Sequence, residues 1–172
     1  PCLQRLLRNR PASLDDRFTA VLADAALRSD EIEAARHLPT DLVGALIDTG
    51  VFRMWVPRCY GGAETPVQDL LDAIELAAYH DGSTGWCVMI GGTTALNAGH
   101  LAPEAAQLIY GDPRAVTGGF GRPAGRAVAE GSGLRVSGTW QWGSGTSHCT
   151  WIGGGVRIVD EQGEASRLPA GT

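Results

Sequence analysis

The residues best suited to chemistry in this chain lie between positions 134 and 152, where a loop of small polar residues joins two strand-like runs. The loop is built from Gly, Ser and Thr, and Trp140, Trp142 and Trp151 lie close to it in the sequence. Such a loop offers backbone N–H groups and small hydroxyls at close range, and the tryptophans supply rigid aromatic surfaces beside them. This combination suits a flat ligand that forms hydrogen bonds at its edges, and a flavin ring is the natural candidate.

Other kinds of site find less support. His148 follows Ser147, but adjacent residues of a strand point to opposite faces, so in that geometry the pair cannot form the hydrogen bond that nucleophilic catalysis requires. Gly119 and Gly121 imitate a dinucleotide-binding fingerprint, yet a proline and a strand follow where that fingerprint needs a helix. No metal site is predicted, because neither the histidines nor the cysteines have the spacing of metal ligands. They are His37, His80, His100 and His148, and Cys2, Cys59, Cys87 and Cys149.

The composition is that of a globular protein. The chain has 172 residues, of which 44% are hydrophobic and 19% charged, and its formal net charge is −5. A negative balance argues against nucleic acid as the main partner, and scattered cysteines are typical of the reduced cytoplasm, where we expect the protein to lie. Residues 82–103 carry no Asp, Glu, Lys or Arg, but their small and polar residues favour a helix buried in a bundle over a membrane span.

The order of the sequence patterns predicts an α+β protein, with a helical domain over residues 1–112. Before residue 113, apolar residues recur at helical spacing in segments separated by Gly, Pro and Asp. Ser13 and Thr40 are expected to cap two helices, and residues 65–68 have the pattern of a capping box. In the helix that follows this box, the residues expected to face the core are Val67, Leu70, Leu71, Ile74 and Ala78.

From residue 113 the pattern changes to short alternating runs separated by glycines. Strands are predicted at residues 115–117, 126–129, 134–142 and 151–159. They imply an incomplete, antiparallel, barrel-like β-domain over residues 113–172. So few strands leave unpaired edges, and we expect another copy of the chain, a homologous subunit or further parts of the protein to cover them.

Three motifs follow one another in unbroken order along the chain. The first starts at Leu38-Pro39, continues through a helix that ends at Gly50, and closes in the turn Pro57-Arg58-Cys59-Tyr60-Gly61-Gly62. The second is a helix from Asp69 to Asp81 with Ser83 after it, and the third is the loop region already described. Together they resemble the acyl-CoA dehydrogenase superfamily over about residues 38–160.

The third motif is similar to one branch of that superfamily. From Ser137 to Trp151 it reads Ser-Gly-x-Trp-x-x-x-Ser-Gly-x-x-His-x-x-Trp, which resembles the oxygenase components of two-component flavin monooxygenases. The resemblance implies an N-terminal α-domain, a middle β-domain and a C-terminal four-helix domain that this chain does not contain. In the dehydrogenase members the catalytic base belongs to that last domain or to a neighbouring subunit, so this chain alone is expected to lack it, and no catalytic residue is assigned.

The resemblance also implies where a flavin, either FAD or FMN, would bind. The hydroxyl of Ser144 and nearby N–H groups would contact the pyrimidine edge of the ring, and the start of the β-domain would approach its other edge. Trp86 and Thr94 would face a small-molecule substrate. From the residues alone, Ser144 is better explained as a hairpin cap, Trp86 equally well as a core residue, and Gly119 as a strand end with positive φ. The expected cofactor contacts are Thr117, Gly119, Phe120, Gly121, Trp142, Gly143, Ser144 and Gly145.

Departures from the family patterns bear on the function. The dehydrogenases carry an acidic residue at the start of the β-domain, and its absence here favours the monooxygenase branch, in which reduced flavin and dioxygen act on an aromatic compound. Monooxygenase relatives, however, often have His where this chain has Thr94, and Ser where it has Gly119. Dehydrogenation of an acyl-CoA is therefore kept as the alternative. A non-catalytic chain that pairs with a homologous subunit is a third interpretation.

Overall fold

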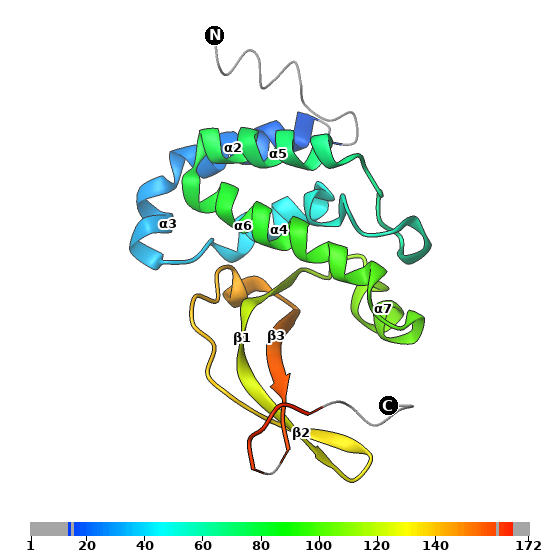
Figure 1. Ribbon diagram of the computed structural model, residues 1–172. Coiled ribbons are helices and arrows are strands. Elements are labelled where there is room, and N and C mark those ends of the chain that lie inside the picture. Colours follow the sequence, from blue (N-terminus) through cyan, green and yellow to red (C-terminus); the bar gives the residue numbers. More distant parts are fainter. Residues whose placement is uncertain (1–13, 15, 161, 167–172) are drawn as a thin grey trace. The chain divides into compact units, whose positions relative to one another are not determined.

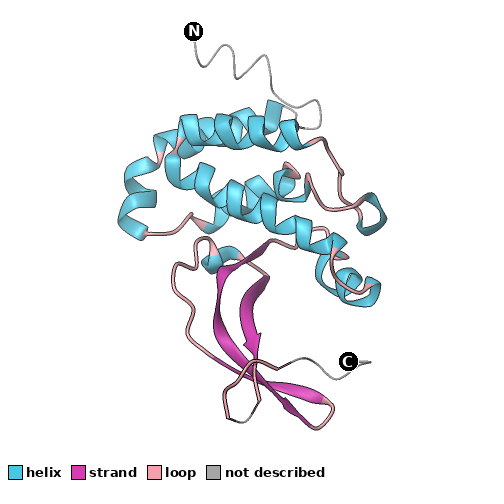
Figure 2. Cartoon of the chain, in the orientation of Figure 1, coloured by secondary structure: helices cyan, strands magenta, loops and turns pink. Residues whose placement is uncertain are grey.

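The structure is a computed structural model that describes residue 14, residues 16–160 and residues 162–166. Helices come first and strands follow (Figures 1 and 2), which confirms the α+β class. The chain divides into two compact units. One, here called the helical unit, contains residues up to 118 together with 144–151, and the other, the strand unit, contains residues 119–143 and 152 onward. The predicted cap Ser13 lies outside the described residues.

The helical unit is built around one apolar core. Figure 1 shows α5 packed against both α2 and α6. The α-helices are α2 (Asp16–Leu27), α3 (Ser29–Ala35), α4 (Thr40–Asp48), α5 (Val67–His80), α6 (Gly82–Thr94) and α7 (Pro103–Tyr110). The 3₁₀ helices are η1 (Val51–Arg53), η2 (Arg58–Tyr60), η3 (Ala95–Gly99) and η4 (Thr146–His148). The fully buried side chains of the α-helices include Phe18, Leu22, Leu42, Leu46, Leu70, Leu76 and Val88. None of the described helices combines the length and apolar character that a membrane crossing requires.

The face that helix α5 turns to the core matches its sequence pattern only in part. Leu70 is buried and Ile74 packs against the core as predicted. Val67 is 62% exposed and Leu71 47% exposed, and Ala78 is exposed as well. Ala73 and Leu76, which were not predicted to face the core, are fully buried. The helix carries two apolar stripes at helical spacing, and only its packing against α2 and α6 decides which stripe is covered.

The predicted caps are also corrected. Thr40 is the first residue of α4 and does not cap it. Thr65 donates its hydroxyl to the carbonyl of Met54 at 3.1 Å, so it makes no capping hydrogen bond to α5. The side chain of Asp81 caps the start of α6, where it accepts a hydrogen bond from the N–H of Thr84 at 2.6 Å. Asp81 thus ends α5 and starts α6, and it joins the two helices in a sharp turn.

The strands form one three-stranded sheet in the order β2-β1-β3. β1 and β2 pair in antiparallel register, with Arg126 opposite Ser137 and Glu130 opposite Gly133. The runs predicted at 115–117 and 126–129 belong largely to one continuous strand, and the run predicted at 134–142 ends as a strand at residue 137. The bounds are β1 (Thr117–Glu130), β2 (Gly133–Ser137) and β3 (Trp151–Ile158).

The third strand runs parallel to β1, so the sheet is mixed. Gly119 lies against the backbone of Gly153, and further along both strands the N–H of Val159 donates to the carbonyl of Ala127 at 3.0 Å. The predicted antiparallel pairing therefore applies to β1 and β2. Strands β2 and β3 lie on opposite sides of β1, so no tight turn can join them, and the chain makes a long excursion through residues 138–150 before β3 begins. That excursion carries half of the residues predicted to bind a cofactor, and the other half lie at the start of β1.

Candidate functional site

The second half of the excursion, residues 144–151, is fixed to the helical unit. The N–H of Thr150 donates to the carbonyl of Val116 at 2.8 Å, and the Thr150 hydroxyl lies 3.1 Å from that carbonyl and 3.2 Å from the Val116 nitrogen. The ring of His148 lies 6.2 Å from the ring of Phe52 in η1, measured between centroids. The loop that the sequence placed inside a β-domain is therefore held by the residue before β1 and by a core aromatic side chain.

Helix α6 presents one face that carries both predicted substrate residues. Trp86, Ile90 and Thr94 are four residues apart, so they share a face of the helix. Trp86 is 55% exposed. Thr94 is half-buried, and its hydroxyl oxygen lies 2.8 Å from both the carbonyl and the hydroxyl oxygen of Thr117. The hydroxyl of Tyr110 donates to the Thr94 carbonyl at 3.0 Å. The structure thus brings predicted substrate residue Thr94 into direct contact with predicted cofactor residue Thr117.

The turn at Ser144 and Gly145 also lies beside the start of β1. A side chain added at Gly118 would place its Cβ 2.6 Å from the Sγ of Cys149. The thiol of Cys149 in turn donates to the carbonyl of Gly145 at 3.1 Å. Burial raises the pKa of the Cys149 thiol to about 11, so it remains a neutral donor near pH 7. Gly145 has a φ of +71°, which glycine adopts without strain.

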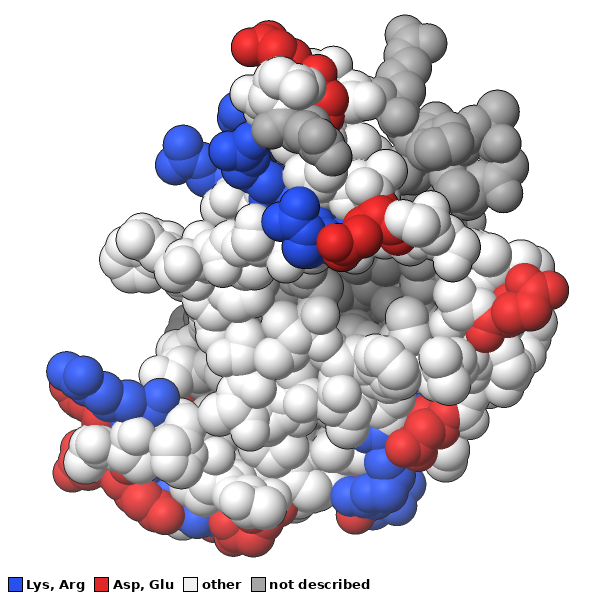
Figure 3. Space-filling model, turned by 90° about the horizontal axis from the view of Figure 1, so that it is seen from below, with Lys and Arg blue, Asp and Glu red and all other residues white. Residues whose placement is uncertain are grey.

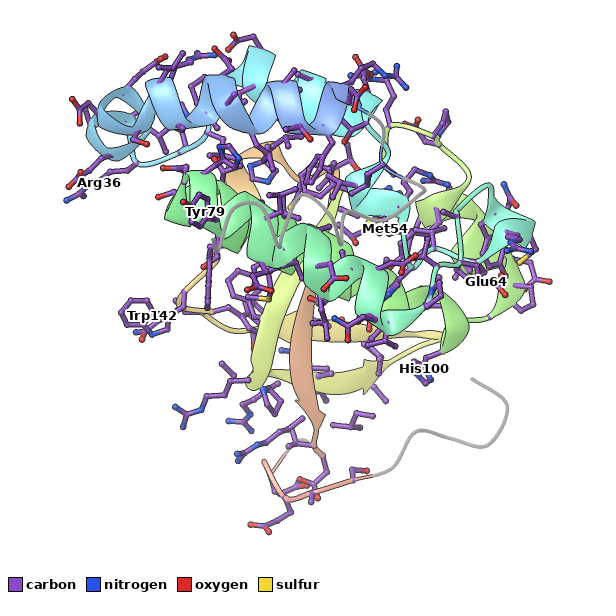
Figure 4. The ribbon with its side chains drawn as sticks, turned by 90° about the horizontal axis from the view of Figure 1, so that it is seen from above. Arg36, Met54, Glu64, Tyr79, His100 and Trp142 are labelled. Atoms are coloured by element: carbon purple, nitrogen blue, oxygen red, sulfur yellow. The ribbon has the colours of Figure 1, made fainter. Side chains whose placement is uncertain are left out.

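In the strand unit, Phe120, Gly121 and Trp142 line one hollow of about 620 Å³. Trp142 is 90% exposed, and Figure 4 shows its side chain projecting away from the ribbon. Trp140 does the opposite, because its indole N–H donates to the carbonyl of Gly155 at 2.9 Å and its ring packs on the sheet. The strand predicted over residues 134–142 ends at Ser137, before both tryptophans, so strand alternation does not place them on one face.

Gly119 has a packing reason for being glycine. A Cβ at this position would lie 2.8 Å from the carbonyl oxygen of Gly153 in β3. Its φ is not in the left-handed region, so the expectation of a strand end with positive φ does not apply. The two parallel strands approach too closely here for a side chain, and a serine would force them apart.

Trp142 is the residue whose backbone most suggests a binding role. Its φ of +66° lies in the left-handed region, where a bulky residue is strained, and its exposed ring gains little burial in return. We expect Trp142→Gly to raise the free energy of unfolding by up to about 1 kcal/mol while weakening ligand binding. Urea unfolding and flavin titration of the same variant measure both effects. A loss of stability in Trp142→Gly would contradict the assignment of the strain.

His148 holds the loop in place, and sequence reasoning missed this role. Its Nδ1 is buried without a hydrogen-bond partner among the described residues, and burial lowers the pKa of the imidazole. Its ring also lies against Gly145. The only sequence signal was the position of His148 within the third motif, and it did not indicate that the ring packs against η1.

This burial makes the stability of the helical unit sensitive to acid. The unfolded chain protonates His148 near its ordinary pKa of about 6.5, whereas the folded chain resists protonation until lower pH. The stability that depends on a neutral His148 is therefore fully present above about pH 6.5. It is lost as the pH falls through the lowered pKa of the folded state. Urea titrations of His148→Phe should show a weaker loss between pH 6.5 and 5, whereas His100→Gln, at an exposed position, should behave like the unaltered chain. Equal slopes for all three would contradict this account.

Charge and metal-binding groups do not point to another site. Among the described residues, no group of His, Cys, Asp or Glu side chains is placed to hold a metal ion. On the face drawn in Figure 3, basic side chains occur in small groups, several of them with acidic side chains nearby, and a broad area between the groups is uncharged. In the helical unit, the exposed ring of Trp86 and the half-buried turn at Ser144 are better suited to a planar, uncharged ring than to a polyanion.

Comparison with known proteins identifies relatives over most of the chain, although no protein-family model matches it. The oxygenase subunit HsaA of a flavin-dependent monooxygenase from Rhodococcus jostii (strain RHA1) is 31% identical over 146 residues, which are 84% of this chain and 38% of HsaA. Indole-3-acetate monooxygenase from Pseudomonas putida is 31% identical over 144 residues, 83% of this chain and 36% of that protein.

A solved structure gives the same result. XiaF from Streptomyces sp., in complex with FADH2 and glycerol, superposes with a TM-score of 0.81 at 28% identity, over 96% of this chain and 40% of XiaF. The chain therefore spans about two fifths of the length of the relatives that it matches. Within that span, sequence and fold agree with the resemblance first suggested by the three motifs. The chain is a homologue of the oxygenase subunits of flavin-dependent monooxygenases, and it shares their acyl-CoA dehydrogenase-like fold.

Proposed function

We propose that this chain is part of the oxygenase component of a flavin-dependent monooxygenase, which uses reduced flavin and dioxygen to hydroxylate a small aromatic molecule. One observation carries the proposal. In the helical unit, the contact of Thr94 with Thr117 and the contact of Cys149 with Gly118 join the face of α6, the start of β1 and the Ser144–Gly145 turn at one corner. These three segments are the ones that the family resemblance associates with substrate and flavin.

The residues at this corner suit a flavin ring, either of FMN or of FAD. The Ser144 hydroxyl makes no hydrogen bond to another described residue, so it is free to bind the polar edge of a ligand. The carbonyl of Gly145 already accepts bonds from the His148 N–H and the Cys149 thiol, and these bonds hold the turn rigid. Trp86 offers an exposed aromatic surface. A bound flavin supplies the activation of dioxygen, while the protein binds and orients the reactants.

Thr94 serves in this proposal as a positioning residue. Its hydroxyl is engaged with Thr117 and with the carbonyl of Ile90 at 2.9 Å, and a threonine hydroxyl does not take part in acid–base chemistry near pH 7. Its role is to hold the end of α6 against the start of β1 and to offer a hydrogen-bond acceptor to a substrate hydroxyl. A group that transfers protons to the substrate would then come from elsewhere in the protein.

The proposal also includes a partner that covers the edges of the sheet. Every residue of β2 is exposed, and β2 and β3 are the two edges of the sheet. Unpaired edges of this kind are normally covered. We infer that another copy of the chain, a homologous subunit or further parts of the protein cover them.

The decisive experiment supplies reduced FMN or FAD to the chain without air, then adds isotopically labelled dioxygen with indole-3-acetate or phenol as probes. A product that carries one labelled oxygen atom supports the proposal. Ser144→Ala should weaken flavin binding by about three- to tenfold, the value of one hydrogen bond, whereas Ser147→Ala, at an exposed position in the same loop, should not. Bleaching of oxidised flavin by an acyl-CoA in the absence of air would instead identify a dehydrogenase, and a chain that binds no flavin would point to a non-catalytic role.

A further inference from the structure

Side-chain hydroxyls from three segments of the helical unit form a connected cluster, of which the proposed function uses only one member. They belong to Thr94 at the end of α6, Tyr110 at the end of α7 and Thr117 at the start of β1. The hydroxyl oxygens of Thr94 and Thr117 lie 2.8 Å apart. The Tyr110 hydroxyl donates to the Thr94 carbonyl at 3.0 Å and is also hydrogen-bonded to the Thr117 side chain. This hydroxyl cluster therefore connects a tyrosine of the core with the residue proposed to face the substrate.

The direction of each hydrogen bond in the hydroxyl cluster follows from its partners, because a hydroxyl has a single proton to donate. Tyr110 donates its proton to the Thr94 carbonyl. The Thr94 hydroxyl lies 2.8 Å from the Thr117 carbonyl and 2.9 Å from the Ile90 carbonyl, and a carbonyl can only accept. The proton of Thr94 is therefore used within the protein. The Thr117 hydroxyl has two possible acceptors, which are the hydroxyl oxygens of Tyr110 and Thr94.

Burial decides between these two acceptors. Tyr110 is 3% exposed, whereas Thr94 is half-buried and can accept a hydrogen bond from water or from a ligand. Among the described residues, Thr117 is the one donor in contact with the Tyr110 oxygen, and a buried acceptor without a donor is costly. Burial raises the pKa of Tyr110, and the hydrogen bond with Thr117 opposes this rise, as a donor to the phenol oxygen does. Thr117 therefore donates to Tyr110, and the Thr94 oxygen keeps a lone pair for a ligand.

We propose that Tyr110 is a positioning residue that keeps the Thr94 hydroxyl as a hydrogen-bond acceptor, so that the site selects aromatic rings bearing an O–H or N–H group. The inference rests on the proposed function, which places the substrate against the face of α6 that carries Thr94. On that face the exposed ring of Trp86 offers an apolar surface to the substrate ring, and Thr94 accepts its polar hydrogen. A ring with only an acceptor at that place would face a second acceptor and gain no hydrogen bond.

The test compares the binding of indole and benzofuran, which have nearly the same shape and differ in an N–H group or an ether oxygen. Burial alone would favour benzofuran, because it is the less polar of the two. We expect isothermal calorimetry to show that indole binds about three- to tenfold more tightly, the value of one hydrogen bond. Tyr110→Phe keeps the aromatic ring but allows Thr117 to turn its proton to Thr94. This variant should lose the preference for indole.

A second substitution separates this role from a structural one. In the double variant Tyr110→Phe/Thr117→Val, no hydroxyl proton is left to occupy Thr94, so the preference for indole should return. A merely structural role of Tyr110 predicts instead that the double variant is at least as impaired as Tyr110→Phe. Tyr60→Phe is the matched control, because Tyr60 packs against the same apolar cluster as Tyr110, and it should keep the preference. Thr94→Val should abolish the preference directly, which keeps the test valid if Tyr110→Phe does not fold.

The outcomes distinguish this inference from the proposed function. Equal binding of indole and benzofuran, or a preference that Tyr110→Phe or Thr94→Val retains, would overturn the inference and leave the labelled-oxygen experiment to decide the function. Failure of the double variant to regain the preference would also overturn it, and so would a chain that binds neither ring. If no labelled product forms but the preference follows Tyr110 and Thr117 as expected, the ring site is supported and the monooxygenase activity is not.

Discussion

Replacing Arg53 with methionine is expected to lower the free energy of unfolding of the helical unit by about 3–5 kcal/mol. Arg53 is only 8% exposed, and its guanidinium donates to three backbone carbonyls. They belong to Tyr60 at 2.5 Å, to Tyr110 at 2.9 Å and to Asp112 at 2.9 Å. Tyr110 is the last residue of α7, where helix carbonyls have no partner within the helix, and Asp112 follows in the turn after it. Arg53 therefore joins η1, η2 and the end of α7 through one side chain.

Methionine would fill the space of the Arg53 stem but leave the carbonyls of Tyr60 and Tyr110 without a donor, whereas the Asp112 carbonyl keeps the N–H of Ala115 at 3.1 Å. Each loss of a buried partner costs about 1–3 kcal/mol. Burial already lowers the pKa of Arg53, which shows that the folded chain pays for holding a charge there. The measurement is the midpoint of urea unfolding at pH 7. Arg53→Lys keeps the positive charge, but its single ammonium group cannot reach three separate carbonyls at once. We therefore expect a loss in the free energy of unfolding that is smaller than that of Arg53→Met.

Arg114→Met is the matched control for this prediction. Arg114 also forms a long-range contact, an ion pair with Asp48, but both side chains are more than half exposed. Exposed ion pairs contribute about 0–1 kcal/mol. If Arg53→Met and Arg114→Met shift the midpoint equally, then the buried carbonyl contacts do not hold these three segments together, and our account of the helical unit fails.

Replacing Gly85 with alanine is expected to destabilise the chain by about 1–3 kcal/mol, although alanine is the better helix former. Gly85 lies on α6 where that helix meets α5, and an added Cβ would stand 2.5 Å from both the Cα and the Cβ of Ala78. Atoms of this kind cannot approach so closely, and the backbone of α5 would have to move. Helix propensity alone predicts a gain of about 1 kcal/mol, so a measured loss would show that packing dominates.

Gly82→Ala is the corresponding control on the same helix. A Cβ at Gly82 meets nothing within 4 Å, so this variant should be neutral or slightly stabilising. Thermal unfolding of the two variants side by side measures the difference. Equal melting temperatures would mean that α5 and α6 separate at little cost. In that case the position of Trp86, on the turn of α6 next to this contact, would not be fixed by packing.

Sequence patterns predicted correctly those elements that depend on near neighbours. The α-helices lie before residue 113 as predicted, and the alternation after Gly133 marked β2. The three motifs predicted the family relation, and the comparisons confirm it. In each case the signal is a residue type and its spacing, which local geometry turns directly into a helix end, a strand or a turn.

The same patterns gave wrong predictions where a segment could adopt either of two locally equivalent structures. Val67 and Leu71 form an apolar stripe on α5 as regular as the buried one, and they are exposed. The run that contains Trp140 and Trp142 alternates like a strand, but the ladder between β1 and β2 ends at the pair Arg126–Ser137. The chain leaves the sheet after residue 137, and the two tryptophans take opposite roles, one packed on the sheet and one exposed.

By itself, the sequence determined the order of helices and strands, the family and the residue types available for a flavin site. Only the tertiary structure decided which of these residues meet. Thr150 binds Val116 across 34 positions of sequence, Thr94 binds Thr117 across 23, and Tyr110 binds Thr94 across 16. Spacing along the chain fixes the periodicity of a segment, since backbone geometry repeats locally. Contacts between distant segments depend instead on how the core packs, and no local pattern encodes that packing.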